Sequence, residues 1–268
     1  MVRIFTIPIL AFCAALALVA ADQKQPTPKS KGELEALQKM LGQQDPDARI
    51  KAAEDLLSKF ADTDYKGLAF YVEAMSYQQK NDYDKMVVYG EQAIQADPKQ
   101  YQAMLLLAQA TAQRTREFDL DREEKLARAE KYAKDAMEIV KDLPKPNPQI
   151  SDDQWAQAKK EYLAQAHTAL GNVAKARKNY DLAVTELKQS LDLGSDPIAM
   201  VQLAVVYDLQ KKPDDALPLL EKVMAMTDVS ASVKQFAQAE KVRATQLKAA
   251  GANPASSPPP PQVEIKKQ

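Results

Sequence analysis

The stretch that decides the fold is GLAFYVEAMSYQQKNDYDKMVVYGEQAIQADPKQ, residues 67–100. Its apolar residues recur three and four positions apart on both sides of the polar turn Lys80-Asn81-Asp82. This period places them on one face of each of two helices, and so short a turn makes the helices antiparallel. The stretch therefore predicts a helical hairpin.

The hairpin carries an ordered set of small, aromatic and proline residues, and two later stretches repeat it. In residues 67–100 the set consists of Phe70, Ala74, Tyr77, Ala93 and Pro98. In residues 164–197 it consists of Leu170-Gly171, Ala183, Leu187 and Ser190. In residues 198–228 it consists of Leu203-Ala204, Tyr207, Ala216, Leu220 and Val223. The last two stretches share one register, which indicates an internal repeat.

This pattern resembles the tetratricopeptide repeat, in particular that of exported bacterial members of the family. The resemblance implies an all-α fold, a stack of antiparallel helical hairpins that winds into a right-handed superhelical solenoid. The first stretch departs from the family at three places, where Glu73 replaces leucine, Met86 replaces alanine and Gly90 replaces an aromatic residue.

The rest of the chain extends the hairpin pattern on both sides of these repeats. Helix pairs are predicted at 31–42 and 47–60, 65–79 and 83–96, 99–116 and 121–141, 152–176 and 180–193, and 197–210 and 214–226. A last helix near 230–249 is expected to cap the stack, and the folded body spans residues 31–250. Pro218 falls inside a predicted helix and predicts a late start or a kink there.

The repeat at 101–144 is the weakest of the four. It keeps Leu107-Ala108, but the next alanines come late, which indicates an insertion between Thr111 and Lys125. The prolines at 144, 146 and 148 then end the helix. This break either bends the stack or separates two half-arrays.

Both ends of the chain differ from the body. Residues 1–21 have the order of a secretory signal, a positive Arg3, an apolar run and small residues before Asp22. Cleavage after Ala21 is expected, with an uncleaved anchor or lipidation at Cys13 as alternatives; after cleavage no membrane-spanning segment would remain. Residues 22–30 are predicted to be a flexible leader. The sequence Gly251-Ala252-Asn253-Pro254 is expected to stop the last helix, and residues 251–268 are predicted to be a disordered proline-rich tail.

Composition argues against several classes of function. The chain has 36 basic and 37 acidic residues, so no excess of positive charge favours nucleic acid. Its single cysteine lies in the predicted signal and its single histidine, His167, takes a packing position of the repeat, so no metal or cofactor is expected. No phosphate-binding or nucleophile motif is present, and we expect no catalytic residue.

The resemblance also implies a binding surface, because the first helix of each hairpin in this family lines a concave groove. The corresponding residues here are Leu68, Tyr71, Met75, Gln78, Leu105, Gln109, Thr168, Asn172, Lys175, Val201, Val205 and Asp208. Some family members clamp a terminal carboxylate with lysine and asparagine in this groove. Asn172 occupies one clamp position but Thr168 the other, so such a clamp is not expected.

The sequence thus predicts a non-enzymatic scaffold that binds a protein or peptide outside the cytoplasm, as a periplasmic or secreted protein; its oligomeric state is left open. The alternative is a structural or tethered component of a cell-envelope assembly complex, in which the tail makes the decisive contact. Four consecutive prolines, residues 258–261, are compatible either with a spacer or with a segment that docks in an aromatic groove.

Overall fold

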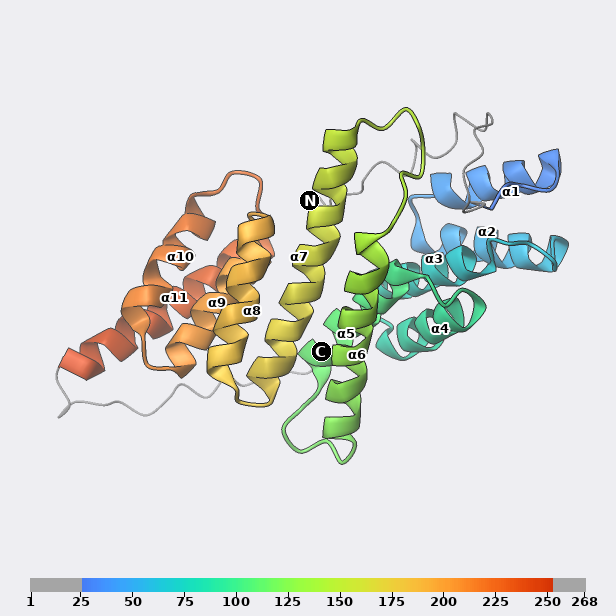
Figure 1. Ribbon diagram of the computed structural model, residues 1–268. Coiled ribbons are helices and arrows are strands. Elements are labelled where there is room, and N and C mark those ends of the chain that lie inside the picture. Colours follow the sequence, from blue (N-terminus) through green and yellow to red (C-terminus); the bar gives the residue numbers. More distant parts are fainter. Residues whose placement is uncertain (1–25, 253–268) are drawn as a thin grey trace. The chain divides into compact units, whose positions relative to one another are not determined.

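The computed structural model describes residues 26–252, and within that range the chain forms eleven α-helices and no strand (Figure 1). The predicted all-α fold is confirmed. The chain divides into two compact units between Asp196 and Pro197. We call residues 26–196 the N-terminal unit and residues 197–252 the C-terminal unit, and describe each by itself.

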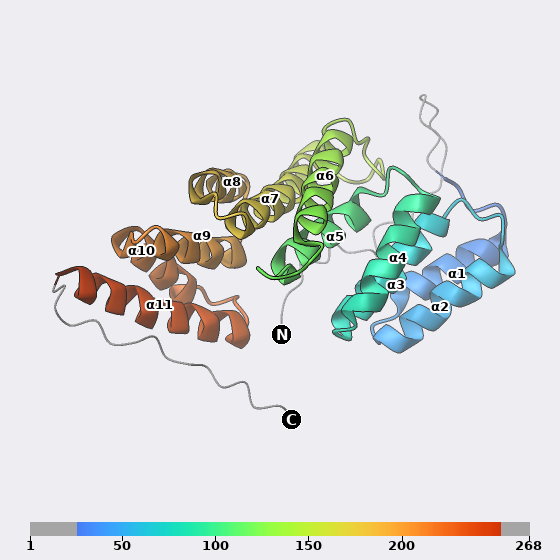
Figure 2. The same cartoon turned by 90° about the horizontal axis from the view of Figure 1, so that it is seen from below.

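The N-terminal unit consists of four helical hairpins. Their helices are α1 (Lys31–Gly42), α2 (Pro46–Lys59), α3 (Lys66–Gln79), α4 (Tyr83–Ala96), α5 (Tyr101–Arg114), α6 (Arg122–Lys141), α7 (Asp152–Ala176) and α8 (Tyr180–Leu193). Each hairpin packs on the next, α2 against α3, α4 against α5 and α6 against α7 (Figure 2). The predicted stack of hairpins is therefore present in this unit.

The C-terminal unit is one hairpin followed by a long helix. Helices α9 (Pro197–Leu209) and α10 (Pro213–Ala225) form the hairpin, and α11 (Ala231–Ala252) packs against both. Helix α11 reaches Ala252, which is three residues beyond the expected helix end at residue 249 and lies inside the predicted stop sequence, residues 251–254. Gly251 does not take the left-handed conformation with which glycine usually ends a helix.

Local side-chain caps explain why the helices begin where the sequence predicts. The side chains of Ser30, Asp45, Asp82, Ser151 and Asn179 each accept a hydrogen bond from the backbone N–H three residues later. Such caps satisfy N–H groups that have no partner within the helix. Because a cap needs only neighbouring residues, these boundaries could be read from the sequence.

Three hairpins share one turn between their helices. Asn81, Lys178 and Lys211 occupy equivalent places and have φ angles of 60°, 62° and 59°. In each case the next residue donates its N–H to the carbonyl five residues back, as Asp82 does to Tyr77. This is the usual way to end a helix with a left-handed residue. The shared turn confirms that residues 67–100, 164–197 and 198–228 repeat one structural unit.

The α5–α6 connection differs from these turns. Residues 115–121 form a longer loop at the place of the predicted insertion. The Asp119 carboxylate holds this loop by accepting from the Arg116 N–H at 3.2 Å and from Lys125 Nζ at 3.2 Å. Phe118 projects from this loop and is 91% exposed.

The proline-rich segment after α6 does not separate two half-arrays. Helices α6 and α7 flank it, pack against each other and belong to the same unit. Trp155 of α7 donates its indole N–H to the Leu143 carbonyl at 3.2 Å, which closes the connection. The division of the chain lies at Asp196 instead, where the sequence shows an unbroken repeat register.

The structure bears on two other local expectations. Helix α10 begins at Pro213 and contains Pro218, so the predicted late start is wrong. Pro218 is exposed, so water can solvate the carbonyl that its missing N–H leaves free. Residues 26–30 of the predicted flexible leader contact the body, because Tyr65 donates its hydroxyl to the Pro26 carbonyl at 2.6 Å and Lys29 pairs with Asp64 at 3.2 Å.

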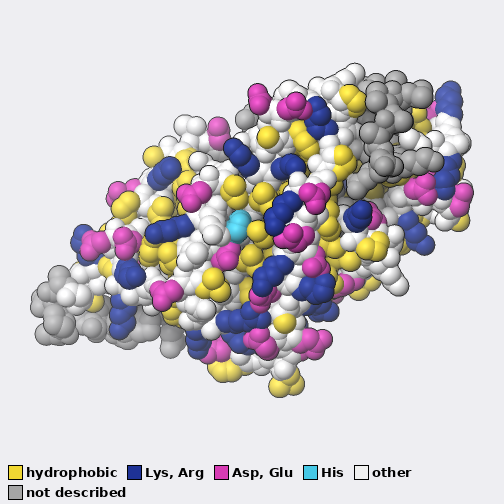
Figure 3. All heavy atoms as spheres, viewed as in Figure 1, with side chains coloured by type: hydrophobic (Ala, Val, Ile, Leu, Met, Phe, Trp, Pro, Cys, Tyr) yellow, Lys and Arg dark blue, Asp and Glu magenta, His cyan; other side chains and the backbone are white. Residues whose placement is uncertain are grey.

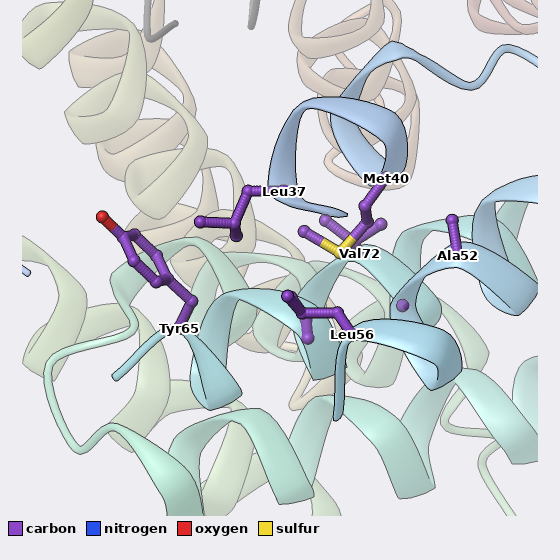
Figure 4. Packing of buried hydrophobic residues seen from close by; sticks show 8 residues of the cluster. Leu37, Met40, Ala52, Leu56, Tyr65 and Val72 are labelled. Atoms are coloured by element: carbon purple, nitrogen blue, oxygen red, sulfur yellow. The ribbon is translucent and has the colours of Figure 1, made fainter. Parts of the chain in front are cut away.

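The core of the N-terminal unit consists of clusters of buried residues that lie between neighbouring helices. Between α1, α2 and α3 it contains Leu37, Met40, Ala52, Leu56, Tyr65 and Val72 (Figure 4). Between α5, α6 and α7 it is built mostly from alanines, including Ala108, Ala133, Ala136, Ala166 and Ala169. Small residues there allow the helices to approach closely, so no hairpin buries its apolar face alone.

Candidate partner-binding surface

The first helices of successive hairpins lie side by side in the N-terminal unit. Helix α5 contacts both α3 and α7, so the three form one surface, which we call the first-helix surface. These three helices carry all the predicted groove residues of this unit. The structure therefore brings together residues that lie about a hundred positions apart in the sequence.

Three tyrosines meet on this surface. The rings of Tyr101 in α5 and Tyr162 in α7 pack edge to face with centroids 4.9 Å apart. Burial raises the pKa of Tyr71 in α3, and the neighbouring Tyr162 raises it further. Burial likewise raises the pKa of Tyr101, beside Tyr162 and Tyr71. The ring contact of Tyr101 with Tyr162 joins α5 to α7, and Tyr71 of α3 lies close enough to both to interact with them electrostatically.

Five predicted groove residues are buried and face the interior. They are Leu105, Thr168 and Asn172 in the N-terminal unit, and Val201 and Asp208 in the C-terminal unit. The Thr168 hydroxyl, for example, lies 2.8 Å from Ser190 Oγ and 3.0 Å from the Ala164 carbonyl. Direct contact between these five side chains and a partner is therefore not supported, because neighbouring helices already cover them.

The other predicted groove residues are exposed to different degrees and can contact a partner. Gln78 is exposed, and Met75, Gln109, Lys175 and Val205 are half-buried. Leu68 packs against the core between α1, α2 and α3. The groove hypothesis is thus narrowed in the N-terminal unit to the part around Met75, Gln78, Gln109 and Lys175.

Tyr101 and Tyr162 are members of this surface that the sequence prediction missed. Tyr162 precedes the repeat frame that starts at Ala164, because α7 begins at Asp152 and is longer than a repeat helix. Tyr101 falls at the first residue of its helix. An aromatic residue at each site was the available signal, but neither matches a groove position of the family.

Two carboxyl groups are buried although the sequence analysis did not predict their burial. Glu73 in α3 is 1% exposed and its Oε2 has no hydrogen-bond partner within residues 26–252. Burial raises its pKa to about 8, and Glu54 contributes in the same direction. Asp208 in α9 is 3% exposed, and both of its carboxylate oxygens lack a partner in the described part of the chain. Burial raises its pKa to about 6 although Arg243 opposes the shift.

His167 is half-buried and lies against one acidic residue. Its Nδ1 is 2.7 Å from Glu186 Oε2, a contact between α7 and α8. Within residues 26–252 there is no group of three or more side chains that could hold a metal ion. On the face shown in Figure 3, acidic and basic side chains are interspersed, so no extended field of one sign is visible.

Comparison with known proteins agrees with the geometry. Residues 69–100 and residues 198–227 each match a family model described as tetratricopeptide repeat. These ranges are the α3–α4 and α9–α10 hairpins, two of the three hairpins that share the left-handed turn. This chain is a tetratricopeptide-repeat protein.

One solved structure supports the fold of this tetratricopeptide-repeat protein. It is similar to a thermophilic tetratricopeptide-repeat protein of Thermus thermophilus, with a TM-score of 0.54, 20% identity and coverage of 74% of this chain and 91% of that chain. An assembly chaperone of RpL4 is more distant, with a TM-score of 0.40, 15% identity and coverage of 85% and 100%. No curated protein matches the sequence.

Tetratricopeptide repeats generally mediate protein–protein interactions and are typically parts of non-enzymatic scaffolds. No helix between residues 26 and 252 is long and apolar enough to cross a membrane.

Proposed function

We propose that this chain is a non-enzymatic scaffold that binds a protein or peptide partner on the first-helix surface of its N-terminal unit. The observation that supports this most directly is the side-by-side packing of α3, α5 and α7. It lines up half-buried side chains of mixed character, the apolar Met75, the amide Gln109 and the basic Lys175. Such a mixture suits an extended peptide, whose backbone needs hydrogen-bond partners and whose side chains need apolar contacts.

A pair of matched variants tests this proposal. Met75→Glu with Gln109→Glu places two charges on the first-helix surface, whereas Lys131→Glu with Lys134→Glu changes exposed residues of the second helix α6. We expect the first pair to abolish capture of a specific protein from cell-envelope extract, while the second pair and the wild-type chain retain it. Circular dichroism checks that both variants stay folded. Equal capture by the two variants would contradict the proposal.

We also propose that the scaffold acts outside the cytoplasm, as a periplasmic or secreted protein. The support is the order of charged, apolar and small residues in positions 1–21, which lie outside the described residues. Mass spectrometry of the protein purified from its native cells tests this. A mature chain that begins at Asp22 and is recovered from the periplasm or the medium is the expected result; an intact Met1 in a cytoplasmic fraction would contradict it.

A further inference from the structure

The loop between α5 and α6, residues 115–121, carries two strongly exposed apolar side chains. Phe118 is 91% exposed, and Leu120 is also fully accessible to solvent. The other exposed large apolar side chains of residues 26–252 are at most 52% exposed. Figure 3 shows apolar side chains at the lower tip of that view, the place that this loop has in Figure 1. Single exposed apolar side chains are normal, but two so close together indicate a surface that another molecule covers.

The polar side chains of this loop hold it in place. The Asp119 carboxylate accepts from the Arg116 N–H and from Lys125 Nζ, both at 3.2 Å. Glu117 pairs with Lys178, which lies in the turn between α7 and α8. The loop is thus ordered by its carboxylates while its apolar side chains face solvent. A loop that is already ordered loses little conformational entropy when another surface covers it.

A hollow elsewhere in the N-terminal unit complements the loop in shape. It has a volume of about 450 Å³ and is lined by Lys66, Phe70, Gln92, Gln95 and Ala96, none of which is a predicted groove residue. We call it the Phe70 hollow, because the half-buried Phe70 ring forms its apolar wall. Lys66 Nζ lies 6.0 Å from the centre of that ring. Its volume is in the range of small-molecule pockets, about 300 to 1,000 Å³, so it has room for an aromatic side chain.

The loop and the hollow also differ in electrostatic character. Residues 116–125 contain five acidic and three basic residues, which gives this segment a formal charge of −2. The hollow carries the ammonium group of Lys66 and the amide N–H₂ groups of Gln92 and Gln95, and no carboxylate lines it. The acceptors of the loop therefore match the donors of the hollow, and their charges attract each other.

Within one chain the loop and the hollow lie at opposite ends of α5. Tyr101, the first residue of α5, interacts with Tyr71, the neighbour of Phe70 in α3. The hollow is therefore near the start of α5, whereas the loop follows its last residue, Arg114. Because α5 has 14 residues, its two ends are about 21 Å apart. The loop cannot fill the hollow of its own chain, but it can fill that of another copy.

We propose that Phe118 of one copy of this chain inserts into the Phe70 hollow of a second copy. Each copy has one loop and one hollow, so the contact is head to tail and leaves a loop and a hollow free. Contacts of this kind build rings where the rotation closes and open chains where it does not. The contact uses none of the residues proposed to bind a partner on the first-helix surface, so the two proposals can fail separately.

Sedimentation of the purified chain tests whether it self-associates. The sample is the chain from Asp22 to Gln268, which contains every described residue and lacks the apolar run of residues 1–21. Analytical ultracentrifugation at chain concentrations up to about 1 mM detects association with a dissociation constant in the micromolar range or below. We expect an average mass that exceeds that of one chain and rises with concentration.

Two variants each remove one half of the contact. The loop variant, Phe118→Ser with Leu120→Ser, takes away the exposed apolar side chains. The hollow variant, Lys66→Glu with Gln95→Glu, places carboxylates beside the hollow, where they repel the acidic loop. All four substituted residues are exposed, so both variants should stay folded, which circular dichroism checks. Each variant alone should sediment as a single chain.

A control variant shows whether the loss is specific. Val88→Ser with Leu182→Ser removes two other exposed apolar side chains of the N-terminal unit. Neither residue belongs to the loop or lines the hollow. The control should therefore associate like the wild type.

Mixing the two variants then identifies the contact. The loop variant keeps an intact hollow, and the hollow variant keeps an intact loop, so a pair of them can form one contact but no further one. We expect the equimolar mixture to form dimers and no larger species. A symmetric contact between two loops would not give this result, because the loop variant could not take part in it.

Three results would overturn the proposal. One is a wild-type chain that sediments as a single chain at every concentration. Another is self-association of the loop variant or of the hollow variant at the level of the wild type. The third is an equimolar mixture that sediments as single chains, or a control variant that no longer associates.

Discussion

The hairpins α3–α4 and α9–α10 both match the repeat family, yet they fill their interiors in opposite ways. In α4 the large buried residue is Met86, and Gly90 follows one turn later. In α10 the order is reversed, with Ala216 first and Leu220 second, both buried. Each second helix thus carries one large and one small residue at these two places, which keeps the packed volume similar.

At Gly90, a side chain from the next hairpin fills the space that a larger residue would occupy. A Cβ atom at Gly90 would lie 2.8 Å from Leu107 Cδ2, so Leu107 of the next hairpin occupies the space. In the α7–α8 hairpin the same device works within one repeat, since a Cβ at Gly171 would lie 2.7 Å from Leu187 Cγ. A departure from the family pattern in one hairpin can therefore be compensated by its neighbour.

The two hairpins also differ in their buried carboxyl groups. Glu73 takes the place that Leu203 has in α9, and its nearest charged influence is Glu54, of the same sign. Asp208 in α9 has Arg243 as well as Glu240 nearby, both from α11. Burial is the main cause that raises the pKa of Glu73 to about 8 and that of Asp208 to about 6, and the neighbouring charges add to it at Glu73 while Arg243 opposes it at Asp208. Opposite charges near a buried carboxyl limit its loss of ionisation.

The largest expected effect comes from breaking the contact between hairpins. Leu107→Ala should lower the free energy of unfolding by about 3 kcal/mol, because it removes a buried side chain and leaves a cavity beside Gly90. Gly90→Ala alone should cost about 1 kcal/mol through overcrowding. In the Leu107→Ala background, Gly90→Ala should leave the free energy of unfolding unchanged or raise it. Urea unfolding of the four chains of this double-mutant cycle measures the coupling.

Leu220→Ala is the matched control for this cycle. This substitution removes an equally buried leucine in the C-terminal unit, so it should also lower the free energy of unfolding by about 3 kcal/mol. Its effect should add to that of Gly90→Ala without coupling. Additive behaviour of Leu107→Ala with Gly90→Ala would show that Leu107 does not fill the glycine position.

A smaller effect is expected from Glu73→Leu, which gives α3 the residue type of α9. Because the pKa of Glu73 is raised in the folded protein, its protonated carboxyl group makes its full contribution to the free energy of unfolding below pH 4.5. This contribution is lost as the pH rises toward about 8. The variant should be more stable than the wild type by about 1 to 2 kcal/mol at pH 8 and gain little at pH 4. Urea unfolding across this pH range measures the difference.

Asp208→Asn sharpens the same comparison. Its pH-dependent difference from the wild type should develop between about pH 4 and pH 6 and remain constant above, because the pKa of Asp208 is raised only to about 6. An identical pH dependence for both variants would mean that the neighbouring charges Glu54 and Arg243 do not distinguish the two sites.

The smallest effect concerns the turn that both hairpins share. Lys211 holds a φ of 59°, which is unfavourable for a residue with a side chain, whereas asparagine, as at Asn81, tolerates it. Lys211→Gly should therefore raise the free energy of unfolding by about 0.5 to 1 kcal/mol, and Asn81→Gly by less. Thermal unfolding measures both, and equal gains would show that asparagine has no advantage in this turn.

Local interactions account for what could be predicted. The helix boundaries agree with the sequence to within about two residues because caps such as Ser30 and Asn179, and turns such as Lys80 to Asp82, involve only near neighbours. The repeated hairpins follow from the spacing of small and large residues. Helix α11 runs to Ala252, three residues beyond the expected end at residue 249, and Gly251 does not take a left-handed conformation.

The candidate binding surface could be predicted only in part. The sequence placed twelve residues on the first helices, but five of them are covered by neighbouring helices. Periodicity identifies one face of a helix, whereas burial depends on which other helices pack against that face. For the same reason the sequence did not show that Tyr101 and Tyr162 join Tyr71, or that a hollow opens beside Phe70.

The sequence by itself determined an all-α chain of antiparallel hairpins and the repeat family to which it belongs, because helix period, caps and turns act over a few residues. Only the tertiary structure decided that Leu107 fills the space at Gly90, that Glu73 is buried near Glu54, and that the chain divides at Asp196 instead of at its proline-rich segment. These features arise from contacts between helices, whose free energy depends on the combined shape of side chains distant in the sequence.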